Sequence, residues 1–154
     1  MPSLLLEQAN DILLRTLNQA RSRGMPPVAV ALLDPGGHLQ ALQRGDGVSF
    51  LRTDIAIAKA WGALAMGVGS RQISERYQLG TQQAGFINAL NAMTGGRVVP
   101  LPGGVLIEDD DGEVRGALGV AGGASDDDEA CGVSAIEAAG LVAVPGAPPA
   151  PGVP

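Results

Sequence analysis

The stretch RVVPLPGGVLIEDDDGEVRGALGVAGG, residues 97–123, carries the densest structural signals in the chain. It predicts three short apolar strands, at residues 98–101, 105–108 and 114–120. Tight turns are predicted between them at PGG and at DDDG, because aspartate and glycine supply the local hydrogen bonds and the positive φ that tight turns need. The closing glycines leave the backbone bare where the chain exits the sheet, which allows a neighbour or a ligand to come close.

A second apolar hairpin lies upstream of this stretch. Residues 28–33, VAVALL, form a continuous apolar run that is typical of a strand buried on both faces. DPGG at 34–37 predicts a turn, and residues 38–43 alternate as the returning partner. The two hairpin regions together predict five strands in a mainly antiparallel sheet.

Helical segments are predicted on either side of these strands, at residues 3–23, 50–66, 70–93 and 126–144. Ser49 and Ser125 are the expected N-caps of the second and last segments, and Asp128 completes a capping box with Ser125. The segment 70–93 is either one helix interrupted near Gly80 or two helices. This order of elements predicts an α+β fold, with helices covering a five-stranded sheet.

A chain of 154 residues is expected to form one domain, which we place at residues 3–144. The segment PGAPPAPGVP, residues 145–154, cannot form a helix or a central strand, so we expect an extended or disordered tail.

Charge and composition exclude several classes of function. The formal net charge is −6, which argues against binding to nucleic acid or to an anionic membrane surface. The single cysteine rules out an internal disulfide. Charged residues interrupt the apolar N-terminus with helical spacing, so we expect a structural helix rather than a signal peptide. We therefore expect a cytoplasmic protein.

His38 is the only histidine and the only side chain whose ordinary pKa lies near neutrality. It could serve as a general base, with Asp34 as a second proton-transfer group, or as an axial haem ligand. The alternative is a polar residue at the start of a strand after a turn.

Arg52 and Lys59 lie two helical turns apart and are expected to share a face. They could hold a carboxylate-bearing ligand. A solvated helix face or salt bridges between subunits explain the same pattern. A ligand at the glycine-rich stretch would meet bare backbone at Gly103 and Gly104.

Other candidate sites fit simpler explanations. The acidic runs 109–111 and 126–129 lack the alternating ligands of a calcium loop, so we expect a solvated turn and a helix start and no metal. The loop 119–125 matches neither common phosphate-binding pattern. Cys131 follows several carboxylates, which disfavour a thiolate nucleophile.

The chain resembles the GlcG/HbpS-like haem-binding family, also called haem-degrading or DUF336 proteins, which is related to the C-terminal domain of PduO-type proteins. The resemblance rests on VAVALLDPGGHLQALQRGDG, DIAIAKAWGAL, PLPGGVLI and GALGVAGGASDDDEACGVSAIEAA, at residues 28–47, 54–64, 100–107 and 116–139. It implies a profilin-like sandwich that assembles into homo-oligomers of four to eight copies. It also implies binding of haem, cobalamin or another planar ligand.

Two positions depart from the family pattern. Trp61 stands where members commonly carry a small polar residue, and it could fill a ligand space or stack on a flat ligand. GVAGG at 119–123 replaces the usual GVSGG.

Three functions remain open from the sequence. The leading one is a small-molecule binding protein with haem or a related tetrapyrrole as ligand, for which His38 is the axial candidate. The second is a cofactor-independent isomerase or hydrolase acting on a small carboxylate-bearing or aromatic metabolite. The third is an oligomeric accessory protein without a site.

Overall fold

The computed structural model describes residues 3–146. Within them the chain forms, in order, α1 (Leu6–Ser22), β1 (Ala29–Leu33), β2 (Leu39–Arg44), α2 (Phe50–Met66), α3 (Ser70–Tyr77), α4 (Thr81–Met93), β3 (Gly104–Glu108), β4 (Val114–Ala121), α5 (Ser125–Ala138) and β5 (Val142–Val144). The predicted tail lies outside the described residues from position 147 onward.

The five strands form one sheet in the order β2-β1-β4-β3-β5, and every neighbouring pair is antiparallel. This confirms the predicted α+β class with a five-stranded antiparallel sheet. β4 lies at the centre, where Leu118 pairs with Leu32 on one side and with Val105 on the other. β1 and most of β3 and β4 are buried, as the continuous apolar runs indicate.

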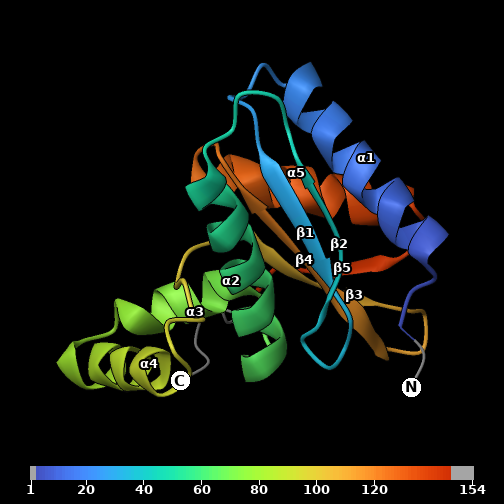
Figure 1. Ribbon diagram of the computed structural model, residues 1–154. Helices are drawn as coiled ribbons and strands as arrows, with labels where there is room; N and C mark the ends of the chain where they lie inside the picture. The colour runs from blue at the N-terminus through green and yellow to red at the C-terminus, as the bar shows by residue number, and fades with distance from the viewer. Residues whose placement is uncertain (1–2, 147–154) are drawn as a thin grey trace.

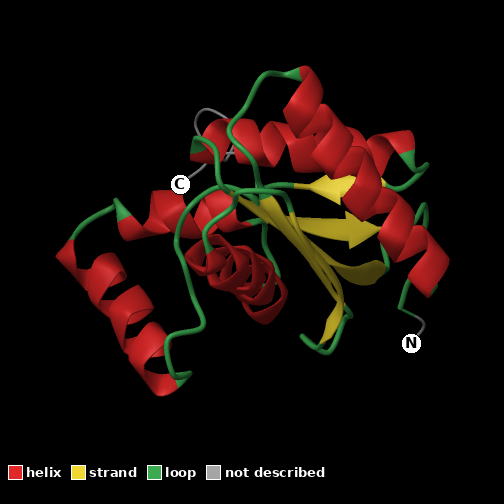
Figure 2. Cartoon of the chain, turned by 45° about the horizontal axis from the view of Figure 1, so that its top comes forward, coloured by secondary structure: helices red, strands yellow, loops and turns green. Residues whose placement is uncertain are grey.

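Helices cover both faces of the sheet (Figure 1). α1 and α5 pack on one face over a core that includes Ile12, Leu32 and Ile136. α2 packs on the other face over small side chains, among them Ala31, Ala117 and Ala121. The α3–α4 pair extends away from the body, and α4 lies farthest from the sheet in both ribbon views (Figures 1 and 2).

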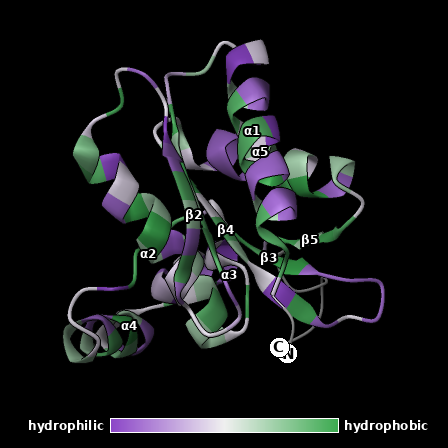
Figure 3. Cartoon of the chain, turned by 45° about the vertical axis from the view of Figure 1, so that its right-hand side comes forward, coloured by the Kyte–Doolittle hydropathy of each residue, from purple (hydrophilic) through white to green (hydrophobic). Residues whose placement is uncertain are grey.

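α1 shows how the apolar stripe directs packing. Ile12, Leu13 and Ala20 are buried, whereas Glu7 and Asp11 face solvent. The helix is banded in purple and green along its length (Figure 3). A stripe of this period buries one side of a helix and leaves the other in water, as predicted for residues 3–23.

Two glycines let α2 approach the sheet closely. Gly104 of β3 and Gly119 of β4 are register partners directly beneath the helix. A Cβ atom on Gly119 would collide with the carbonyl oxygen of Ala56, and one on Gly104 would collide with the carbonyl oxygen of Lys59. The glycines of the 97–123 stretch therefore act here as packing surfaces for a helix backbone.

Three helix boundaries agree with the sequence prediction. The Ser49 hydroxyl accepts a hydrogen bond from the backbone N–H of Leu51, as an N-cap does. Gly67 ends α2 in the left-handed conformation. The 70–93 segment forms two helices, and the break falls next to Gly80, as one of the two predicted alternatives has it.

The predicted strand at 98–101 is wrong. Val98 is apolar and buried because it packs against Ile73 and Ile87. Its backbone N–H donates to the side-chain Oδ1 of Asn91, not to a strand. β3 starts only at Gly104, so this segment is a connection between α4 and β3 that is buried at Val98 and exposed at Leu101.

The predicted end of the last helix is also wrong. α5 stops at Ala138, and Gly140 adopts a φ of +83° that the chain uses to turn back. Residues 142–144 then form the fifth strand, β5, on the free edge of β3. The segment that was predicted as the end of this helix is therefore a strand of small apolar residues.

The predicted capping box at Ser125 does not form. Ala124 is the N-cap of α5, and it makes no side-chain capping bond. Asp128 instead turns its carboxylate toward the backbone N–H of Gly123 and toward Lys59. The carboxylate is used to join α5 to the rest of the core.

The β3–β4 turn depends on the charge of Asp109. Its carboxylate accepts hydrogen bonds from the backbone N–H groups of Glu113 and Asp111, and from Arg115 Nε. The bond from Glu113, followed by those from Arg115 and Asp111, lowers the pKa of Asp109 below its usual 3.8. The unfolded chain therefore takes up this proton at a higher pH than the folded chain does.

We expect Asp109→Asn to destabilise the protein above pH 5 and to have progressively less effect on acidification. A depressed folded-state pKa contributes stability above the unfolded pKa, and that stability is lost as pH falls through the folded value. Urea unfolding of both proteins at pH 7, 5 and 3 measures this. A difference in unfolding free energy that stays constant with pH would contradict the assignment.

Candidate functional site

An open groove lies along the outer face of α2. Its floor is built from Asp54, Ile57, Ala58 and Trp61, which follow the i, i+3, i+4, i+7 spacing of one helix face. Gly37, from the β1–β2 turn, and the 96–97 segment after α4 form its walls. The groove has a volume of about 490 Å³. We call it the Trp61 groove.

Trp61 and Arg97 form the groove's aromatic and cationic end. The Arg97 guanidinium carbon lies 5.5 Å from the centre of the Trp61 ring, in a cation–π contact. On the other side, Gly37 packs against the indole edge, and a Cβ on this residue would lie 3.2 Å from Trp61 Nε1. Gly37 has a φ of +83°, so glycine suits the turn in both conformation and space.

The polar groups of the groove have no partner elsewhere in the described chain. Arg97 makes no hydrogen bond or ion pair within residues 3–146, nor does Asp54. The Trp61 indole N–H likewise donates to no atom of that part of the chain. A concave surface with apolar side chains and a few unpaired polar groups is the usual form of a ligand site. It suits a flat molecule whose acid group lies at the Arg97 end, because Trp61 offers a ring face and Arg97 a positive charge, while Asp54 adds a negative charge to the floor.

A smaller hollow continues the groove past the indole. It has a volume of about 120 Å³ and is lined by Pro35, Gly36, Gly37, Trp61, Leu64 and Ala65. Trp61 therefore stands between two concavities, with the β1–β2 turn along both.

His38 and Asp34 lie together at this turn. His38 Nδ1 is 3.3 Å from Asp34 Oδ1, and the imidazole is 82% exposed. Asp34 Oδ1 also accepts hydrogen bonds from the backbone N–H groups of Gly36 and His38, so the carboxylate holds the turn. The two residues adjoin Gly37, the wall of the Trp61 groove, but neither lines the groove itself.

Lys59 does not face the groove. Its side chain is 2% exposed, and Nζ donates to the Val120 carbonyl oxygen at 2.8 Å and lies 3.3 Å from Asp128 Oδ2. Asp128 is equally hidden, at 1% exposed. Burial lowers the pKa of Lys59 and raises the pKa of Asp128, while each charge acts on the other in the opposite direction. The pair ties α2 to α5 across β4.

The other residues predicted to bind a ligand, Arg52, Gly103 and Gly104, also lie outside the Trp61 groove. Arg52 is exposed whereas Lys59 is buried, so they do not present a common anion-binding face. Gly103 and Gly104 are buried beneath α2, where a Cβ on Gly103 would lie 2.9 Å from Lys59 Nζ. Of the predicted ligand-binding residues, the structure places Trp61 in the groove and His38 beside it.

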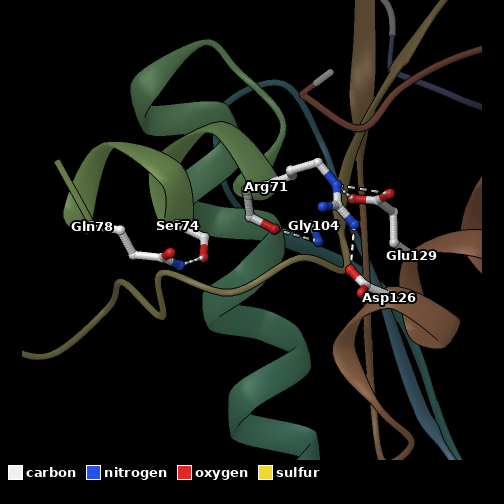
Figure 4. Close-up of polar contacts among 7 residues, drawn as sticks. Arg71, Ser74, Gln78, Gly104, Asp126 and Glu129 are labelled. Atoms are coloured by element: carbon white, nitrogen blue, oxygen red, sulfur yellow. Dashed lines mark hydrogen bonds and ion pairs between the residues drawn. The ribbon is translucent and has the colours of Figure 1, made fainter. Parts of the chain in front are cut away.

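The start of α5 is clamped to α3 by an arginine (Figure 4). Arg71 Nε donates to both carboxylate oxygens of Glu129, at 3.1 and 2.9 Å, and its NH2 group pairs with Asp126. These hydrogen bonds, first the one that Arg71 donates to Glu129, raise the pKa of Arg71. Next to it, the Gly104 N–H donates to Ser70 Oγ at 2.6 Å. Three of the four acidic residues at 126–129, namely Asp126, Asp128 and Glu129, therefore contact other parts of the protein.

Cys131 is buried and sits away from the groove. Burial raises the pKa of its thiol, and Sγ lies 3.2 Å from Met25 Sδ. A neutral thiol in an apolar contact is a packing group, in line with the sequence interpretation.

Sequence reasoning missed Arg97, Asp54 and Gly37 as site residues. They come from three separate segments, and only the docking of α2 against the β1–β2 turn and the 94–97 loop brings them together. One signal was present, since Trp61 is the only tryptophan and departs from the family pattern.

Comparison with known proteins identifies the family. A family model described as haem degrading protein HbpS-like matches residues 4–137. The chain belongs to this HbpS-like family. A Citrobacter freundii relative, an uncharacterised 15.0 kDa protein in the dhaT-dhaS intergenic region, is 29% identical over 111 residues, which are 72% of this chain and 75% of that protein.

Solved structures share the fold of this HbpS-like chain. A crystal structure of a PduOC:heme complex has a TM-score of 0.80 and 26% identity, covering 90% of this chain and 96% of that one. The Klebsiella pneumoniae protein ORFY, of the DUF336 family, has a TM-score of 0.77 and 25% identity, covering 90% and 93%. A Streptomyces reticuli HbpS double mutant, at 24% identity and TM-score 0.73, covers 90% and 88% and supports the fold alone. The likeness agrees with the profilin-like sandwich.

No helix within the described range 3–146 is both long and apolar enough to cross a membrane.

Proposed function

We propose that this HbpS-like protein binds a planar, acid-bearing small molecule in the Trp61 groove, with haem or a related tetrapyrrole as the leading ligand. The observation that carries the proposal is the unpaired Arg97 guanidinium beside the face of Trp61. An aromatic face stacks on a flat ring system, and a guanidinium pairs with a carboxylate in bidentate geometry. The family, and the PduOC:heme complex among its structural relatives, support haem.

Three residues in or beside the groove, Arg97, Trp61 and His38, support haem as the ligand. Asp34 faces Nδ1 of His38, which leaves Nε2 directed elsewhere and available to an iron atom. The turn that carries His38 also forms the groove wall at Gly37. Bound haem would supply a redox-active iron. The protein would hold its propionate with Arg97, stack on the macrocycle with Trp61 and orient the axial imidazole with Asp34.

We expect hemin to quench the fluorescence of Trp61 and to produce a shifted Soret band. Because Trp61 is the only tryptophan, the emission reports on this groove. Arg97→Gln is expected to weaken binding roughly tenfold, the size of one lost charge-assisted hydrogen bond. His38→Ala is expected to change the Soret position while leaving the quenching in place.

Arg21→Gln serves as the matched control, because Arg21 is an exposed arginine that does not line the groove. It should bind hemin as the wild type does. Equal affinities in the Arg97 and Arg21 variants would remove the groove from the proposal. A Soret band unchanged by His38→Ala would remove His38 as axial ligand and leave the groove standing.

The Asp34–His38 pair supports a second function. A histidine whose Nδ1 faces a carboxylate is the arrangement of a general base. A cofactor-independent isomerase or hydrolase would place a carboxylate-bearing or aromatic metabolite in the groove, with His38 and Asp34 moving protons. A bell-shaped pH–rate profile that is lost in His38→Ala would favour this function over simple binding.

We also propose that the protein assembles into a homo-oligomer of four to eight copies, as its family resemblance implies. Native mass spectrometry of protein purified from its own host would give the copy number and any retained ligand together. The cytoplasmic location stays a prediction.

A further inference from the structure

The Trp61 groove carries opposite charges toward its two ends. Asp54 and Trp61 are seven residues apart on α2, which corresponds to about 10 Å along the helix axis. The Arg97 guanidinium carbon lies 5.5 Å from the centre of the Trp61 ring, so the positive charge marks the Trp61 end. Among the residues that line the groove, Arg97 is the only basic side chain and Asp54 the only acidic one. The floor between the two charges is apolar, at Ile57 and Ala58.

Asp54 has no evident task in stabilising α2. A carboxylate in the first turn of a helix interacts favourably with the helix dipole, but Asp54 lies beyond the first turn of α2, which contains no acidic residue. A carboxylate can also pair with a basic residue three or four positions away on the same helix. The residues at those spacings are all apolar, namely Phe50, Leu51, Ile57 and Ala58. Asp54 is therefore an exposed carboxylate that remains available to a ligand in the groove.

The acid group of a ligand belongs at the Trp61 end. Gly37 and Arg97 both lie against Trp61, so the two walls of the groove meet the floor there. The hollow beyond the indole is lined by Pro35, Gly36, Gly37, Trp61, Leu64 and Ala65, none of which has a charged side chain. A carboxylate that moved past Arg97 would gain no second cation in that hollow.

We propose that Asp54 determines the specificity of the groove by receiving a cationic or hydrogen-bond-donating group at the far end of the ligand. The ligand class is then a flat molecule with an acid at one end and an amine, amide or hydroxyl about 10 Å away. Arg97 binds the first group and Asp54 the second, so the ligand binds in one orientation. This inference rests on the function proposed above and narrows its ligand class.

A ligand with an acid at each end is disfavoured, because its second carboxylate would meet Asp54 and like charges repel. Haem carries both of its propionates on one edge. It can therefore turn that edge toward Arg97 and keep both acids away from Asp54.

Three naphthalene probes of the same shape test the two ends. 2-Naphthoate carries the acid alone, 6-(aminomethyl)-2-naphthoate adds an ammonium at the opposite end, and naphthalene-2,6-dicarboxylate adds a second acid there. Their dissociation constants are measured by isothermal titration calorimetry at low ionic strength, where charges are least screened. Relative to 2-naphthoate, we expect the wild type to bind the aminomethyl probe about threefold more tightly and the dicarboxylate about threefold more weakly, the size of an exposed ion pair.

Asp54→Lys should reverse this order, so that the dicarboxylate binds most tightly and the aminomethyl probe most weakly. Lysine is a better helix former than aspartate, so α2 should remain folded, as circular dichroism would show. Asp46→Lys is the matched control, because Asp46 is exposed, lies outside the Trp61 groove and gives the same change in net charge. It should keep the wild-type order. An unchanged order in Asp54→Lys, or the same reversal in Asp46→Lys, would overturn the role of Asp54.

Arg97→Gln tests the other end. It should weaken all three probes, because all three present a carboxylate to this guanidinium, and it should keep the aminomethyl probe the tightest. Affinities equal to those of the wild type would overturn the assignment of the acid to the Arg97 end.

The proposed function and this inference fail differently. Hemin binding without measurable binding of any naphthalene probe would remove the inference and leave the proposed function standing. A protein that binds neither hemin nor any of the probes would remove both. Probe binding with the expected reversal, but without hemin binding, would support the inference and remove haem as the ligand.

Discussion

Replacing Gly119 by alanine is expected to prevent α2 from docking on the sheet. The new Cβ would collide with the carbonyl oxygen of Ala56 and would also press on the Ala60 side chain at 3.2 Å. Both obstacles belong to the helix itself, so no flexible side chain can move aside. Gly119 lies opposite Gly104, where the helix approaches the sheet closely too, so α2 cannot shift along the strands to escape. We expect a loss of roughly 4 kcal/mol or more, the upper end of single-residue effects.

Gly85→Ala is the matched control for this substitution. Gly85 lies inside α4 with open space around its Cβ position, so alanine should stabilise the helix by about 1 kcal/mol. Urea unfolding followed by circular dichroism compares the two variants at one pH. A Gly119→Ala protein as stable as the wild type would mean that α2 does not sit this close to β4.

Replacing Asp128 by alanine is expected to lower the free energy of unfolding by about 3–5 kcal/mol, because it leaves the buried Lys59 ammonium without its charged partner. Lys59 would keep only the Val120 carbonyl among the partners described here, and its 2% exposure denies it water. The Gly123 N–H would lose its acceptor as well. This single substitution thus removes the acceptor of two donors, the Lys59 ammonium and the Gly123 N–H.

The double variant Lys59→Met with Asp128→Leu distinguishes the net contribution of the ion pair from the cost of removing only one of its two charges. Replacing both charges by apolar side chains of similar size is often neutral or stabilising. We therefore expect the double variant to recover most of the stability lost in Asp128→Ala, as measured by urea unfolding. A double variant as unstable as the single one would show that the pair contributes through its shape and hydrogen bonds rather than through charge balance.

Local signals were sufficient for the elements whose packing follows their own pattern. The run at 28–33 and the DPGG turn predict the first hairpin, and the glycines near positions 67 and 80 mark real helix ends. The sequence predictions were wrong where a residue's role depends on a partner that is distant in the sequence. Val98 is apolar because it covers Ile73, and Asp128 is acidic because it meets Lys59. Neither partner is visible in a local window.

The site was less accessible to sequence reasoning than the fold. Chemistry pointed to His38 and Lys59, the residues with the most versatile side chains. The structure buries Lys59 and sets His38 beside the Trp61 groove. Arg97 stands just before the strand predicted at 98–101, and only tertiary packing sets its guanidinium near Trp61. Whether a charged side chain has a partner depends on its surroundings in the fold, which the sequence does not display.

The position of β4 has a consequence for how the chain is made. β1 is synthesised early, yet Ala29 pairs with Ala121, and within residues 3–146 β2 pairs only with β1. The first hairpin alone is marginally stable in water. While the ribosome extends the chain, this apolar hairpin must wait until Val114–Ala121 has left the exit tunnel. Because non-local pairing of this kind slows folding, the nascent N-terminal half is the stage at which we expect chaperones to engage the chain.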